Sequence, residues 1–229
     1  MTLNRYHSAE EACLHLAGLL SRMAEKGANV ALSGGSTPKL LFHTIAEKYT
    51  QTDWSKIRFF WVDERMVPQT DDESNFGVFH RILIASGIVP ETSVFPVRYE
   101  RDEHRSLAAY DQSIREQVPF ADGFPQFDLI ILGIGDDGHT ASLFPGATDY
   151  ASGENVAITH HPQSGQTRLT LTAPLIMRGK RLSYLATGSG KAAILSQIAA
   201  GADYPAARIR ATDGTTEYYL DRAAAAQLS

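Results

Sequence analysis

The sequence predicts an α/β fold, a doubly wound, mostly parallel sheet with helices on both faces. Helical and strand patterns alternate along the chain, and the strand segments 57–62 and 127–132 are nearly continuous apolar runs, as in strands buried on both faces. Glycine-rich or charged clusters follow four of the strands. The 229 residues are 43% hydrophobic, enough for a sizeable core, and we expect a single domain over residues 1–229.

The first elements are a helix, a strand and a second helix. Apolar residues at helical spacing predict a helix over 9–23, and residues 29–33 form the strand that follows. A glycine-rich turn then starts a helix that reaches about residue 48. We expect Thr37 to be its N-cap and Pro38 its first helical residue, because both types are favoured at those positions.

The central part repeats this alternation. Helices are predicted near 74–86 and over 103–117, between the apolar strands 57–62 and 127–132. Residues 127–132 give the strongest strand signal in the chain.

The last third carries shorter strands and one more helix. Weaker strand patterns occur at 156–159 and 168–172, and a stronger one at 182–187 leads into a helix that ends near residue 200. Residues 217–220 are expected to form a final strand.

Composition limits the partners. The net charge of −5 offers no general attraction to nucleic acid or an anionic membrane, so we expect neither, and no obligate protein partner is evident. The single cysteine, Cys13, cannot form an internal disulfide, and no His/Cys spacing indicates a metal site. No signal-peptide pattern or long apolar run is present, so the expected location is the cytoplasm.

The clusters after Ser33, Val62, Leu132 and Thr187 each begin where a predicted strand ends. Because the carboxyl ends of parallel strands share one edge of a sheet, these clusters are expected to form one site. Any anionic ligand must be held by local cations there, since the chain as a whole is acidic.

Two of the clusters suit an anion. Residues 33–37 combine flexible glycines, hydroxyls and a helix amino terminus, which favour a phosphate, although an ordinary strand-to-helix turn explains them equally well. The cluster 188–191 resembles a Walker loop but has Leu185 and Ala192 where glycine and Ser or Thr are needed. Lys191 can still neutralise a phosphate, or it is a solvated helix lysine.

The cluster 133–139 matches the glycine spacing of a dinucleotide loop, but Asp136 and Asp137 would face the pyrophosphate, so we reject that interpretation. A carboxylate two residues before His139 can orient its imidazole as a general base, whereas a lone histidine is more often structural. At 63–65 an arginine lies beside two carboxylates, which indicates either anion binding or a surface ion-pair cluster.

These motifs together carry a family resemblance. The segments SGGSTP at 33–38, WVDER at 61–65, GIGDDGHTASLFP at 133–145 and RLTLT at 168–172 resemble those of the glucosamine-6-phosphate isomerase/6-phosphogluconolactonase family, in the same order and over nearly the whole chain.

The resemblance implies a modified Rossmann-like fold without redox cofactor or catalytic metal, and hydrolysis of 6-phosphoglucono-δ-lactone to 6-phosphogluconate in the oxidative pentose phosphate pathway. His139 is then the base that activates water and Asp137 its neighbour. The residues implied to bind the phosphorylated sugar are Gly34, Gly35, Ser36, Thr37, Asp63, Arg65, Arg168 and Lys191.

Two alternatives stay open. A glucosamine-6-phosphate deaminase resembles this chain but carries a glutamate where Phe144 stands and usually an aromatic residue where Arg65 stands, so both positions favour the lactonase. A non-catalytic sugar-phosphate sensor on the same fold usually carries an attached DNA-binding segment, for which the short, non-basic amino terminus gives no indication.

Overall fold

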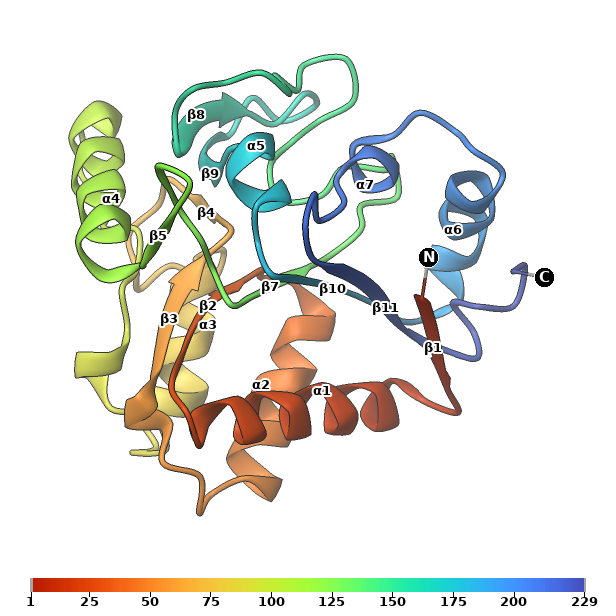
Figure 1. Ribbon diagram of the computed structural model, residues 1–229, viewed down its shortest axis with the longest axis horizontal. Helices are drawn as coiled ribbons and strands as arrows, with labels where there is room; N and C mark the ends of the chain where they lie inside the picture. The colour runs from red at the N-terminus through yellow and green to blue at the C-terminus, as the bar shows by residue number, and fades with distance from the viewer. Residues whose placement is uncertain (1, 229) are drawn as a thin grey trace.

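The computed structural model describes residues 2–228, whose main feature is a parallel sheet of six strands in the order β1-β11-β10-β7-β2-β3 (Figure 1). The described strands are β1 (Thr2–Tyr6), β2 (Ala28–Leu32), β3 (Ile57–Trp61), β4 (Asp63–Arg65), β5 (Phe120–Ala121), β6 (Phe124–Pro125), β7 (Leu129–Leu132), β8 (Val156–His160), β9 (Thr167–Leu171), β10 (Arg181–Ala186) and β11 (Thr215–Asp221). The predicted parallel sheet is confirmed.

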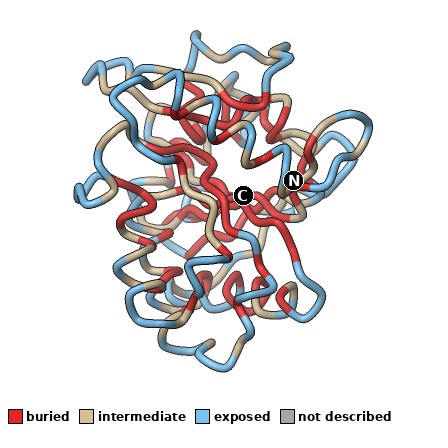
Figure 2. The backbone as a smooth tube through the Cα atoms, turned by 90° about the vertical axis from the view of Figure 1, so that its left-hand side faces the viewer, coloured by how far each residue is buried: buried red, intermediate tan, exposed pale blue. Residues whose placement is uncertain are grey.

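Helices cover both faces of this sheet, as predicted. They are α1 (Ala9–Ala24), α2 (Ser36–Lys48), α3 (Asn75–Phe79), α4 (Glu103–Gln117), α5 (Ala173–Met177), α6 (Ala192–Ala199) and α7 (Pro205–Arg208), with the π-helical segment η2 (His80–Ile84) and the short 3-10 helices η1 (Trp54–Lys56), η3 (Glu91–Ser93) and η4 (Ser189–Lys191). One apolar core lies under α1, α2 and α3, and the other packs against α4 to α7. The central strands are therefore buried on both sides, which explains their largely apolar sequences (Figure 2).

A second, antiparallel sheet of three strands, β4-β9-β8, lies beyond the end of β3. The chain leaves β3 at Trp61 and enters β4 at Asp63, so one continuous segment contributes to two sheets. The sequence predicted strands at 156–159 and 168–172 but not that they leave the main sheet. The register places Arg65 opposite Arg168.

The amino-terminal cap of α2 differs from the prediction. The helix begins at Ser36 with Gly35 as N-cap, so the assignments of Thr37 as N-cap and Pro38 as first helical residue were wrong. Gly35 has φ +108°, a value that glycine adopts readily, and this conformation lets the helix start earlier. The Thr37 hydroxyl instead hydrogen-bonds that of Thr187 at 3.0 Å, tying α2 to the end of β10.

The sequence analysis missed β1, an edge strand that pairs with β11. Its residues are largely polar and half-exposed, so they lack a buried-strand pattern. Within residues 2–228, no helix is both long enough and apolar enough to cross a bilayer.

Candidate active site

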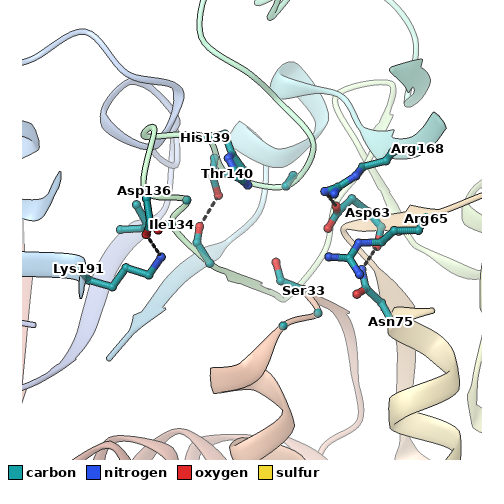
Figure 3. Close-up of a pocket in the computed structure, with 15 residues that line it drawn as sticks. Ser33, Asp63, Arg65, Asn75, Ile134, Asp136, His139, Thr140, Arg168 and Lys191 are labelled. Carbon is teal, nitrogen blue, oxygen red and sulfur yellow. Dashed lines mark hydrogen bonds and ion pairs between the residues drawn. The ribbon is translucent and has the colours of Figure 1, made fainter. Parts of the chain in front are cut away.

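A cavity of about 310 Å³ lies where the winding of the sheet reverses, between β2 and β7. Ligands of doubly wound folds bind at this position, outside the carboxyl ends of the strands. Residues from all four predicted clusters line it. Of the catalytic and sugar-binding residues implied by the family resemblance, those that line the cavity are Gly34, Gly35, Asp63, Arg65, His139, Arg168 and Lys191 (Figure 3).

His139 is held by Asp137 in the loop after β7. Its Nδ1 lies 2.5 Å from Asp137 Oδ1, and the same carboxylate oxygen accepts the His139 backbone N–H at 3.1 Å. A Cβ at Gly135 would lie 2.2 Å from His139 Nδ1, so only glycine leaves room for this imidazole. With Nδ1–H donated to the carboxylate, Nε2 is the basic nitrogen left for a ligand.

The carboxyl group of Asp137 is expected to be negatively charged beside His139. Partial burial by itself raises the pKa of Asp137, but the hydrogen bond from the His139 backbone and the charge of a protonated imidazole outweigh it, so the pKa of Asp137 is lowered. The carboxylate is therefore ionised near neutral pH, in hydrogen-bond contact with the imidazole. Asp137 itself is not among the residues that line the cavity.

Two arginines lie across the cavity from Lys191, and they are direct cross-strand partners: Arg65 in β4 faces Arg168 in β9. Their charges are only partly compensated. Arg65 Nη1 donates to the Glu73 carbonyl at 2.6 Å, and Arg168 Nη1 lies 3.9 Å from Asp63 Oδ2. Burial lowers the pKa of Arg168; Asp63 opposes the shift and Arg65 reinforces it. Like charges directly opposed are destabilising, so this pair favours an anion between them.

Glu64, which sequence reasoning did not assign, fixes one wall of the cavity. Its buried carboxylate accepts the backbone N–H groups of Arg65, Asn75 and Phe76, each at 2.8 Å, and the Ser74 hydroxyl at 3.1 Å. Burial raises the pKa of Glu64 to about 7 despite these donors. The three bonds from Ser74, Asn75 and Phe76 join β4 to the start of α3.

Asp63 has a comparable role on the opposite strand face. It is 6% exposed, its Oδ2 accepts the Ser142 hydroxyl at 2.6 Å, and its carbonyl accepts Asn75 Nδ2 at 2.9 Å. Asp63 therefore connects the loop of His139 to the arginine pair.

Asn75 explains one of the predicted glycines. A Cβ at Gly34 would lie 1.8 Å from Asn75 Oδ1, so the asparagine amide fills the space of a side chain at Gly34. The sequence analysis placed this glycine in an anion-binding turn, but its packing against Asn75 is by itself a sufficient reason for a glycine at this position. Asn75 lines the cavity but was missed, because no local pattern connects position 75 with position 34.

Lys191 occupies the other end of the cavity, where its Nζ lies 2.6 Å from Asp136 Oδ1. Asp136 also lines the cavity and was noted in the sequence only as an obstacle to a dinucleotide. Ser36 and Thr37 are not among the lining residues; they adjoin the cavity through Gly35, at the amino terminus of α2.

Comparisons with known proteins identify the family of the chain. A family model described as glucosamine-6-phosphate isomerases/6-phosphogluconolactonase matches residues 4–218. The 6-phosphogluconolactonase of Haemophilus influenzae is 44% identical over 202 residues, covering 86% of this chain and 85% of that protein. The 6-phosphogluconolactonase of Synechocystis is 37% identical over 213 residues, covering 90% and 87%.

A solved structure is similar over the whole chain. The 6-phosphogluconolactonase of Trypanosoma brucei superposes with a TM-score of 0.87 at 26% identity and covers 100% of this chain and 98% of its own. The order of the four motifs, the cavity they share and these likenesses lead to one conclusion: the chain belongs to the glucosamine-6-phosphate isomerase/6-phosphogluconolactonase family.

Proposed function

We propose that the protein hydrolyses 6-phospho-D-glucono-1,5-lactone to 6-phospho-D-gluconate. The relatives named 6-phosphogluconolactonase support the reaction. The observation that carries the proposal is the position of His139: its imidazole, held by Asp137, lines the same cavity as Arg65, Arg168 and Lys191. A base and an anion-binding wall at the two sides of one small cavity suit a phosphorylated ester.

The reaction is acyl transfer to water. His139 Nε2 takes a proton from a water molecule as its oxygen attacks the lactone carbonyl carbon, and Asp137 stabilises the resulting imidazolium. The tetrahedral oxyanion is stabilised by nearby cationic side chains or amides. When it collapses, the bond to the ring oxygen breaks, and that oxygen takes the proton back from His139 to become a free hydroxyl. The new carboxylic acid then releases its own proton to solvent and becomes a carboxylate.

Binding relies on the cations at the two ends of the cavity. The product has two anionic groups, the phosphate and the new carboxylate, and the cavity offers the arginine pair at one end and Lys191 at the other. Each charged hydrogen bond contributes about 1.5–3 kcal/mol. Backbone groups at Gly34 and Gly35 and the first-turn amides of α2, at Ser36 and Thr37, complete the proposed anion-binding wall.

Phe144 argues against the alternative deaminase reaction. It is 2% exposed, and its ring lies 5.1 Å from that of His139, so this position holds an apolar contact for the base and no carboxylate. A sugar-phosphate sensor is disfavoured because sensing does not require a base held by an ionised partner.

We also propose that residues 2–228 work as one domain, since both apolar cores pack against the same six-stranded sheet.

The test is a direct assay of turnover. Freshly made 6-phosphogluconolactone is hydrolysed in the presence of the protein and its loss is compared with spontaneous hydrolysis, with the unphosphorylated lactone as control. We expect fast turnover of the phosphorylated lactone only. Ammonia release from glucosamine 6-phosphate without lactone hydrolysis would replace this proposal with the deaminase.

A further inference from the structure

Ser33, at the end of β2, has a buried hydroxyl that finds no partner among the described residues. The residue is 5% exposed, its Oγ has no hydrogen bond, and it lines the cavity. Its backbone N–H is bound to the Ile131 carbonyl at 3.1 Å, which fixes the position of the residue. A buried hydroxyl without a partner costs free energy, so native proteins retain few of them.

Unpartnered polar atoms gather at this cavity. Among residues 2–228, seven buried side-chain atoms have no hydrogen-bond partner, and three of these belong to residues of the cavity wall: Ser33 Oγ, Arg65 Nε and Arg168 Nε. Donors that no protein group satisfies, brought together from β2, β4 and β9, indicate a ligand that presents several oxygen atoms.

We infer that Ser33 is a substrate-binding and specificity-determining residue whose hydroxyl contacts an oxygen of the sugar moiety, not the phosphate; this inference rests on the proposed function. Figure 3 shows the hydroxyl at the base of the cavity, between Lys191 on one side and the arginine pair on the other. The anionic groups of the ligand are drawn to those cations, which leaves the neutral part of the sugar above Ser33. A hydroxyl can both donate and accept, as sugar oxygens require.

The test is Ser33→Ala in the full-length protein. One hydrogen bond to a neutral group contributes about 0.5–1.5 kcal/mol, so we expect kcat/KM for the phosphorylated lactone to fall about 2- to 13-fold, with the Kd for 6-phosphogluconate rising in step. The inhibition constant of inorganic phosphate stays within a factor of two. Because the hydroxyl has no partner in the free protein, the melting temperature is not lowered.

Ser183 provides the matched control. Its hydroxyl is also buried and unpartnered, but it lies on β10 and does not line the cavity, so Ser183→Ala should keep wild-type kinetics. Unchanged kcat/KM and Kd in Ser33→Ala would overturn the inference, as would an equal loss of phosphate affinity. Should Ser33→Ala misfold, the nearly isosteric Ser33→Cys gives the same readout. A wild-type protein that does not hydrolyse the lactone contradicts the proposed function itself.

Discussion

Arg65 and Arg168 face each other as cross-strand partners, with Asp63 near the second of them. Two guanidinium groups in this position repel each other unless an anion lies between them. The pair is built by the short antiparallel sheet next to the main sheet, whose first strand, β4, begins one residue after the end of β3.

The arginine pair leads to a prediction about affinity. Arg168→Gln should raise the Kd for 6-phosphogluconate about 10- to 100-fold, because a charged hydrogen bond contributes about 1.5–3 kcal/mol. Isothermal titration calorimetry measures this Kd in the wild type and the variant. The exposed Arg115 on α4, paired with Asp111, is the matched control, and Arg115→Gln should bind as the wild type does. Equal affinity in Arg168→Gln would remove Arg168 from the binding site.

Asp137→Asn tests how the base is held. The amide can no longer stabilise a protonated imidazole, so kcat should fall at least about tenfold, part of the roughly 10²–10⁴-fold that a general base contributes. The Kd for 6-phosphogluconate should change less than about threefold, since Asp137 does not line the cavity. Asp203→Asn, at an exposed ion pair with Arg208, serves as the control. A loss confined to affinity would show that Asp137 binds ligand instead.

Gly34→Ala tests the contact with Asn75. The new Cβ would lie 1.8 Å from Asn75 Oδ1, and overpacking of this kind costs about 1–3 kcal/mol of unfolding free energy. Combining it with Asn75→Ala should cost less than the sum of the two single changes, because the clash disappears. Urea unfolding gives both values, with Gly153→Ala, where nothing lies within 4 Å of the new Cβ, as control. Strict additivity would mean that the two residues do not interact.

The raised pKa of Glu64 leads to a prediction about how the unfolding free energy depends on pH. Burial raises the pKa of Glu64 to about 7, so the folded protein holds this proton over a range, about pH 4.5 to 7, in which the unfolded chain releases it. The contribution of Glu64 to the unfolding free energy therefore falls as pH rises through that range, by about 3 kcal/mol in total.

The measurement compares Glu64→Gln with the wild type by urea unfolding at several pH values. The stability advantage of the wild type should shrink between pH 4.5 and 7 and then stay constant. Glu47→Gln, on the exposed face of α2, should keep a constant difference. An advantage that grows with pH would mean that the four donors around Glu64 lower its pKa.

Much of the fold was predictable because burial on both faces leaves nearly continuous apolar strands, as in β3, where only Arg58 is exposed, and β7. The four site clusters were predictable because parallel strands end at one edge. The edge strand β1 and the separate sheet of β4, β8 and β9 depend on pairing between distant segments, which local patterns do not record.

The same limit applies within the site. His139 and Asp137 are two residues apart, so their contact follows from sequence. Asn75 contacts Gly34 only in the folded chain, because the two residues are far apart in sequence. The hydrogen bonds to the Glu64 carboxylate likewise form only when the start of α3 packs against β4.

The most direct test of the whole account is the rate at which His139→Ala hydrolyses fresh 6-phosphogluconolactone, corrected for spontaneous hydrolysis. We predict a fall in kcat of at least about 100-fold with the Kd for 6-phosphogluconate nearly unchanged. Turnover near that of the wild type would contradict the account, because the base would then have to be a different group.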